Sequence, residues 1–175
     1  MNDVIYECVV TSVSPKGVPH VAPMGVRYQQ GVVILMPFVP SMTLGNILAT
    51  RHAVLNIVLD TRVFAGCVTG RKEWPTVPAE KINGVRLSNA LSHVELQLEA
   101  MDDHDPQRPV LRMARMFEAS HQRFVGFNRA QAAVIEAAVL VSRLHMLPPE
   151  KIDSEMAYLK IAINKTAGPE EHLRN

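Results

Sequence analysis

Short runs of alternating and β-branched apolar residues fill the first part of the chain and predict β-strands. The segments 5–13, 20–28 and 32–36 are rich in Val, Ile and Tyr, and turn-forming residues at 15–17 and 29–31 separate them. Strands joined in this way by tight turns form a β-meander.

The next segments predict a short helix and further strands. A helix is expected over residues 43–49, and the stretch 53–59 (AVLNIVL) is too apolar to be an edge strand facing water. Residues 92–101 (SHVELQLEAM) alternate, and after a turn at 102–106 the segment 110–117 can return as the paired strand. The alternation places Val94, Leu96 and Leu98 on one face and His93, Glu95, Gln97 and Glu99 on the other.

Between these strands the pattern is weaker. Residues 60–70 favour at most a short helical turn around Phe64. Residues 72–84 contain Pro75, Pro78 and Gly84 and are predicted as a loop.

After Gln122 the apolar residues recur at helical spacing. Asn128 followed by Gln131 resembles a capping box, and the helix it begins is expected to continue to Leu147 before two prolines. A second helix is expected over residues 150–165. The apolar stripes are Val134, Ile135, Ala138, Val141 and Leu144 in the first helix, and Ile152, Met156, Leu159 and Ile163 in the second.

This order of elements predicts an α+β fold, with the strands first and a helical hairpin last. We expect a β-barrel over residues 1–122 and a C-terminal hairpin over 123–175. No Pro-, Gly- or Ser-rich linker joins the two parts, and the apolar stripes exceed what two helices can cover by packing on each other. The hairpin is therefore expected to pack on the barrel.

Composition and charge narrow the classes of function. Of the 175 residues, 47% are hydrophobic and 20% are charged, and the net charge of +1 gives no field that would attract nucleic acid or an anionic membrane. The apolar runs are shorter than the roughly 20 residues of a membrane helix, and the first residues show no basic segment leading into an apolar one. Cys8 and Cys67 lie far apart in apolar surroundings, which favours buried thiols over a disulfide. We expect a cytoplasmic protein.

A cluster of polar residues at the start of the first helix suggests an anion site. Ser41, Thr43 and Asn46 surround the beginning of this helix, where backbone N–H groups are free, and Gly45 permits close approach. The alternative is a plain helix N-cap, because Ser and Thr are favoured there without any ligand.

The preceding strand favours the anion site over the plain cap. Ala22, Pro23, Met24 and Gly25 form a segment in which proline and glycine weaken an ordinary strand and permit flat, close approach to the backbone. An isoalloxazine ring is one group that would use such a surface, so a phosphate-bearing cofactor is the leading hypothesis. Neither segment supplies a cation, and the charge would need to come from Arg27, Arg51 or Arg129.

Other site chemistries find less support. The cluster at 102–105 (DDHD) could bind a metal, but it lies between two strands and ends at Pro106, which is typical of a solvated turn. We expect no metal site. The motifs HExxH, GxSxG and GxGxxG and a Walker-type loop do not occur, which argues against hydrolase and P-loop functions.

Three charged residues of the first C-terminal helix are spaced by seven. Arg129, Glu136 and Arg143 lie near one stripe and could form a charge ladder within the helix or at a dimer seam, or the stripe could deliver Arg129 to a ligand. The spacing does not choose between these interpretations.

Together these segments resemble a known family. GVPHVAPMGV, PSMTLGN, AVLNIVLD and FNRAQAAVIEAAVLVSRLHML are similar in order and spacing to the domain of unknown function 447 family, itself similar to flavin-reductase-like split-barrel proteins. The resemblance implies a split β-barrel homodimer with FMN near the subunit interface. It also implies that Ser41, Thr43 and Asn46 hold the phosphate, that residues 22–25 line the flavin, and that Asn56 lies near the ring.

Three functions follow as hypotheses. The first is a flavoprotein oxidoreductase in which bound FMN transfers electrons or hydride. The second is an FMN-binding carrier or sensor without turnover. The third is an interaction module that keeps the barrel and has lost the flavin.

Overall fold

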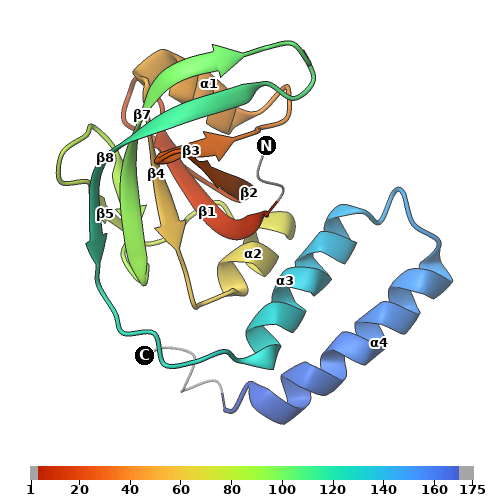
Figure 1. Ribbon diagram of the computed structural model, residues 1–175. Helices are drawn as coiled ribbons and strands as arrows, with labels where there is room; N and C mark the ends of the chain where they lie inside the picture. The colour runs from red at the N-terminus through yellow and green to blue at the C-terminus, as the bar shows by residue number, and fades with distance from the viewer. Residues whose placement is uncertain (1–3, 170–175) are drawn as a thin grey trace. The chain divides into compact units, whose positions relative to one another are not determined.

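The computed structural model describes residues 4–169, which form two compact units (Figure 1). The barrel unit contains residues 4–58 and 72–123, and the helical unit contains residues 59–71 and 124–169. The helical unit therefore includes a segment that lies between two strands in the sequence, in addition to the C-terminal hairpin.

Six antiparallel strands close the barrel in the order β1-β2-β3-β8-β7-β4. They comprise β1 (Tyr6–Val13), β2 (Pro19–Gln29), β3 (Val32–Leu35), β4 (His52–Ile57), β7 (Ser92–Asp102) and β8 (Val110–Ser120). Each strand lies where the apolar pattern predicts one, and the first three form the expected meander. The predicted α+β split-barrel fold with C-terminal helices is confirmed.

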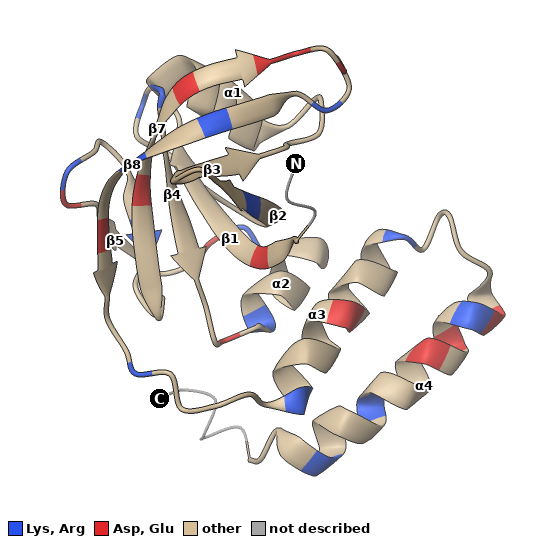
Figure 2. Cartoon of the chain, in the orientation of Figure 1, with Lys and Arg blue, Asp and Glu red and all other residues tan. Residues whose placement is uncertain are grey.

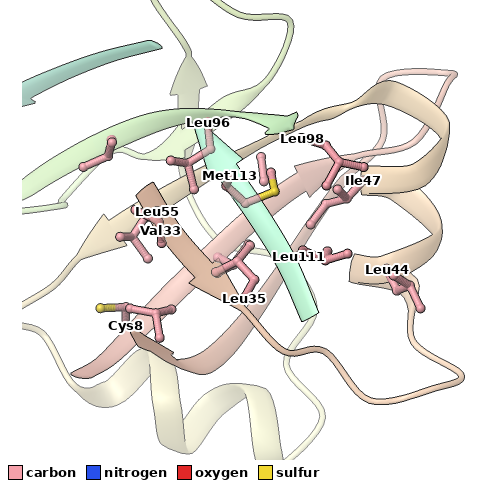
Figure 3. Packing of buried hydrophobic residues seen from close by; sticks show 14 residues of the cluster. Cys8, Val33, Leu35, Leu44, Ile47, Leu55, Leu96, Leu98, Leu111 and Met113 are labelled. Carbon is pink, nitrogen blue, oxygen red and sulfur yellow. The ribbon is translucent and has the colours of Figure 1, made fainter. Parts of the chain in front are cut away.

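The interior of the barrel is an apolar core supplied by alternate residues of the strands. Cys8 and Val10 of β1, Leu55 of β4 and Leu96 of β7 are at most 2% exposed. The helix α1 (Met42–Thr50) adds Leu44 and Ile47 to this core, as Figure 3 shows. Burial of such side chains contributes about 1.5 to 3 kcal/mol each, so α1 is an integral part of the barrel.

The wall between β2 and β8 is only partly closed. β2 pairs with β1 along 19–26, but with β3 only through Arg27–Gln29, and β3 pairs with β8 only through Leu111–Met113. Pro23 has no N–H group to donate, and it lies in the part of β2 that has one neighbouring strand. This partial pairing is the split in the barrel.

The segment predicted as a loop over 72–84 contains regular structure. β5 (Thr76–Pro78) and β6 (Val85–Leu87) pair as a two-stranded sheet, and β6 contacts β1 and β4. We call residues 75–91 the covering hairpin. Its contacts explain why Val9 and Val54, which alternate with core residues, are also fully buried.

The helical unit contains α2 (Arg62–Val68), α3 (Arg129–Ser142) and α4 (Pro149–Thr166). α3 and α4 lie side by side and antiparallel in Figure 1, and the predicted face of α4 (Ile152, Met156, Leu159 and Ile163) is half-buried. α3 ends five residues before the predicted Leu147. None of the helices in residues 4–169 is long and apolar enough to cross a lipid bilayer.

Asn128 begins α3 as predicted. Its Oδ1 accepts a hydrogen bond of 2.8 Å from the N–H group of Ala130, and its Nδ2 donates to the carbonyl of Thr166 at the end of α4. The Thr166 hydroxyl also accepts from the N–H group of Ala130. The cap therefore joins the start of α3 to the end of α4.

Charged residues are spread over both units. Figure 2 shows Lys and Arg interspersed with Asp and Glu along the strands and along α4. The intrahelical ion pair between Lys151 and Glu155 is an example, with 3.0 Å between the charged atoms.

Candidate functional site

The N-terminus of α1 is capped by a side chain from its own sequence. Ser41 is the N-cap, and its hydroxyl accepts a hydrogen bond of 3.2 Å from the N–H group of Leu44. The N–H groups of Met42 and Thr43 have no preceding helical carbonyl to bond. Ser41 therefore caps α1, its role in holding a phosphate stays a prediction, and two N–H groups remain at this helix end for an anion.

Thr43 and Asn46 lie in the first turns of α1, as predicted, but they are buried. They are 2% and 7% exposed, and Nδ2 of Asn46 donates a hydrogen bond of 3.1 Å to the hydroxyl of Ser12 on β1. Asn46 thus fixes α1 to the barrel. Gly45 faces open space, since a Cβ built there meets nothing within 4 Å.

Two arginines lie against the segment that leads into α1. Nη1 of Arg27 lies 3.1 Å from the sulfur of Met36, and its buried Nε has no hydrogen-bond partner within residues 4–169. Arg108 donates from Nε to the carbonyl of Met36, and its guanidinium lies 4.6 Å from the centre of the Phe38 ring. Arg27 is one of the phosphate partners expected from the sequence, whereas Arg108 was not expected.

Pairing of distant segments explains the position of Arg108. The N–H group of Val39 donates a hydrogen bond of 3.0 Å to the carbonyl of Gln107, so the loop before β8 lies beside the loop before α1. This contact follows from the pairing of β3 with β8. No local motif around Arg108 indicates it.

The other two arginines considered as phosphate partners lie elsewhere in the chain. Arg51 follows the C-terminal end of α1 and donates from Nη2 to the carbonyl of Leu98 at 3.0 Å. It is therefore at the opposite end of the helix from Ser41. Arg129 is the first residue of α3 in the helical unit, and its role in binding a phosphate stays a prediction.

The predicted flavin-lining segment forms the partly paired region of β2. Residues 22–25 pair with residues 7–10 of β1. Met24 packs on the core, so Pro23 and Gly25 point to the outer face. A Cβ on Gly25 would lie 2.7 Å from Cγ2 of Ile5, so a glycine permits this close packing. The Ile5 side chain therefore packs against Gly25 on the outer face of the segment.

Asn56 uses its carboxamide within the protein. It is fully buried, and Nδ2 donates to the carbonyl of Val9 at 3.0 Å and to the hydroxyl of Thr11 at 3.1 Å. Its Oδ1 accepts from the N–H group of Leu87 in the covering hairpin at 2.8 Å. Asn56 thus joins β4 to β1 and to the hairpin, and its proximity to a flavin ring stays a prediction.

A buried charged network lies on the outer face of β7, beneath the covering hairpin. His93 and Glu95 are on the face that the alternation of β7 predicts, but the covering hairpin buries both to 1% exposure or less. The Glu95 carboxylate accepts hydrogen bonds from three successive backbone N–H groups, at 2.7, 2.6 and 3.1 Å. These belong to Glu80, Lys81 and Ile82. Nε2 of His93 lies 2.8 Å from the same carboxylate.

These contacts decide the ionisation of Glu95. Burial acts to raise its pKa, but the backbone N–H groups and His93 stabilise the charged form, and the net effect lowers the pKa of Glu95. His93 continues the network to His121 on the surface, with 2.7 Å between Nδ1 and Nε2. Burial and the nearby Arg86 guanidinium lower the pKa of His121.

The thiol of Cys8, which neighbours Tyr28, is not reactive. Burial raises the pKa of Cys8 to about 12, and burial together with the neighbouring Cys8 raises the pKa of Tyr28 to about 12. Because the thiolate is the nucleophilic form, Cys8 is unreactive near neutral pH. Cys8 is buried as expected, whereas Cys67 is half-buried.

Solved structures with the same fold include several flavoproteins. An FMN-bound DUF447 protein from Methanosarcina mazei has 20% identity and a TM-score of 0.75, with 94% of this chain and 87% of that chain covered. A 2-nitrobenzoate 2-nitroreductase from Pseudomonas fluorescens has 18% identity, a TM-score of 0.55 and coverage of 66% and 64%. An NADH:FAD oxidoreductase from Streptomyces globisporus has 10% identity, a TM-score of 0.55 and coverage of 69% and 84%.

At these identities the likenesses establish the fold alone, and no curated protein sequence matches the chain. Family models are more decisive, because they cover most of the chain. The N-terminal domain described as protein of unknown function (DUF447) matches residues 6–122, and a second DUF447 model matches residues 128–173. The chain therefore belongs to the DUF447 family.

Proposed function

We propose that this protein is a flavoprotein that binds FMN and uses it for electron or hydride transfer. One observation carries the proposal: two guanidinium groups, those of Arg27 and Arg108, flank the segment that leads into the free N–H groups of α1. The nitroreductase and NADH:FAD oxidoreductase with the same fold, and the FMN-bound family member, support this assignment.

The residues divide into three groups by role. The N–H groups of Met42 and Thr43, with the Thr43 hydroxyl and the two guanidinium groups, would hold the phosphate. The segment 22–25, with Ile5 packed against Gly25, would line the ring. Ser41 and Asn46 act on the site by fixing α1, since both hydrogen-bond within the protein.

The flavin supplies the redox chemistry when bound, and the chain supplies binding and orientation. Arg27 is suited to binding a phosphate because its guanidinium contacts the sulfur of Met36, and none of the ion pairs in the described residues joins it to a carboxylate. A guanidinium in this state retains most of its capacity to bind a phosphate.

FMN is expected to bind more tightly than riboflavin, because the α1 site recognises the phosphate. Losing hydrogen bonds to a charged group costs roughly 1.5 to 3 kcal/mol each, so we expect a difference of at least about tenfold in Kd. Fluorescence titration of the flavin-free protein with each compound measures it. Equal affinities would remove the phosphate site from the proposal.

Arg27→Met is expected to weaken FMN binding by about tenfold or more and to leave riboflavin binding unchanged. Thr43→Val is expected to act in the same direction. Arg51→Met is the matched control, because Arg51 lies at the other end of α1. Loss of riboflavin binding in the Arg27 variant would indicate a damaged fold, and unchanged FMN binding would exclude Arg27 from the site.

Turnover is tested separately from binding. Anaerobic addition of NADH to the FMN-loaded protein is expected to bleach the visible flavin absorption. Tight FMN binding without bleaching by NADH or NADPH would favour the carrier or sensor function.

We also propose that the protein is a homodimer. β3 is short and pairs with each of its neighbours, β2 and β8, over only three residues, and the apolar Ile5, Tyr6 and Met116 are about half exposed. A second copy would cover these groups and any ligand on β2. Light scattering at micromolar concentration is expected to give twice the 19.4 kDa of the chain, and a monomer mass would contradict the proposal.

A further inference from the structure

Glu95, His93 and His121 form a continuous hydrogen-bonded chain from the interior of the barrel unit to its surface. The His93 and Glu95 side chains are fully buried, whereas His121 is exposed at the end of β8. The two imidazole rings have centres 4.9 Å apart and planes inclined by 17°, with 2.7 Å between their nitrogens. Nearly parallel rings can bring nitrogens this close only edge to edge, which is the geometry of a good hydrogen bond.

The partners of Glu95 fix where the protons lie. Its carboxylate faces three backbone N–H donors, so it carries no proton and accepts a further hydrogen bond from Nε2 of His93. A neutral His93 then has a lone pair on Nδ1, which accepts from Nε2 of His121. The remaining lone pair, on Nδ1 of His121, lies at the exposed end of this hydrogen-bonded series.

We propose that these three residues form an acid–base site, in which Nδ1 of His121 exchanges a proton with a substrate that carries a weakly acidic hydroxyl group. His121 is the catalytic residue of this site, and His93 and Glu95 are positioning residues. The site shares no residue with the proposed FMN site.

The proton transfer balances within the chain of residues. When the substrate hydroxyl gives its proton to Nδ1 of His121, the proton on Nε2 of His121 passes to Nδ1 of His93. His93 keeps its Nε2 proton hydrogen-bonded to Glu95, which stays ionised. The positive charge therefore ends beside the buried carboxylate, and the reverse transfer returns the proton to the substrate anion.

The surroundings of His121 indicate the class of substrate. Arg86 of β6 and Glu80 of the covering hairpin are the charged side chains that act on it, together with His93 of β7. Burial, Arg86 and His93 lower the pKa of His121, so its ring is unprotonated and able to accept a proton at neutral pH. The Arg86 guanidinium would stabilise the anion that remains, which suits a phenol or an enol.

NMR of the full-length chain with ¹⁵N-labelled histidine tests the relay. We expect His121 to carry its proton on Nε2 at pH 7.5 and to titrate below the ordinary 6.5, and we expect a hydrogen-bond coupling between Nε2 of His121 and Nδ1 of His93. Arg86→Met should raise the His121 midpoint, because it removes one cause of the lowering. A proton on Nδ1 of His121, or the absence of a hydrogen-bond coupling between the two rings, would overturn the proposal.

If Glu95 positions His93, its substitution should change the tautomer of His93, which a purely structural role would not do. Glu95→Gln is expected to change the tautomer of His93, whereas Glu99→Gln, which alters an exposed carboxylate on the same strand, should leave that tautomer intact. If Glu95→Gln does not fold, His121→Gln gives the decisive comparison, because His121 is exposed. That variant should fold and shift the Nδ1 resonance of His93, which loses its hydrogen-bond donor, and an unchanged Nδ1 resonance would contradict the relay.

Substrate class is tested with 4-nitrophenol. Its addition is expected to shift the His121 signals and to raise the 4-nitrophenolate absorption at constant pH. His121→Gln and Arg86→Met should each reduce the absorption change by at least threefold, whereas His104→Gln, on an exposed turn, should not. No perturbation of His121 at millimolar 4-nitrophenol would exclude this substrate class.

Discussion

Glu95→Ala is expected to lower the free energy of unfolding by about 3 to 5 kcal/mol, the cost of removing one partner of a buried charge network. The substitution leaves three backbone N–H groups of the covering hairpin and Nε2 of His93 without their acceptor. Urea unfolding followed by circular dichroism measures the change. Glu99→Ala, on the exposed part of the same strand, should cost less than about 0.5 kcal/mol.

The effect of Glu95 depends on pH with a definite sign. Its pKa in the folded protein lies below the ordinary 4.5. The stabilisation is therefore complete above the unfolded pKa and is lost as the pH falls below 4.5 through the folded pKa. The stability difference between wild type and Glu95→Ala should shrink in that range, and a difference that is constant from pH 7 to pH 3 would contradict this account.

Truncation after Gln122 is expected to give an insoluble product. The truncated chain keeps α2, whose Val63 and Phe64 are 4% and 3% exposed, and loses α3, against which α2 packs. Exposing these side chains costs about 1.5 to 3 kcal/mol each and leaves an apolar surface that promotes aggregation. The soluble fraction after expression, and the binding of a hydrophobic dye, measure the effect.

Truncation after Gly168 is the control, since it keeps α2, α3 and α4 and should remain soluble. A chain ending at Gln122 that stayed soluble, dimeric and yellow would show that the helices are an independent appendage. It would also exclude Arg129 from flavin binding.

The barrel was predictable because its strands carry a periodic signal. Residues 5–13 and 92–101 alternate between core and outer face, and turns with glycine or proline separate the early strands, so pattern and structure agree. The end of α3 was not predictable from apolar spacing. Residues 143–147 keep that spacing, but they form turns before Pro148, which disfavours helical geometry in the residue before it.

In the candidate sites, too, contacts between residues close in sequence could be predicted, and contacts between distant segments could not. The Ser41 cap was predictable, because its hydrogen bond to Leu44 spans only three residues. Arg108 and the burial of Glu95 were not, because they depend on strand pairing and on a hairpin without apolar periodicity. Alternation placed His93 and Glu95 on the correct face of β7, and nothing in the sequence indicated that this face is covered.

The anchors of the covering hairpin recognise its backbone. Thr11 donates to the carbonyl of Val85, Asn56 accepts from the N–H group of Leu87, and Glu95 accepts from three consecutive N–H groups. None of these contacts depends on the identity of a hairpin side chain. Other side chains at residues 80–82 can therefore be accommodated without loss of the Glu95 hydrogen bonds, whereas Leu87 and Ala90, which are 2% and 0% exposed, also hold the hairpin through their buried side chains.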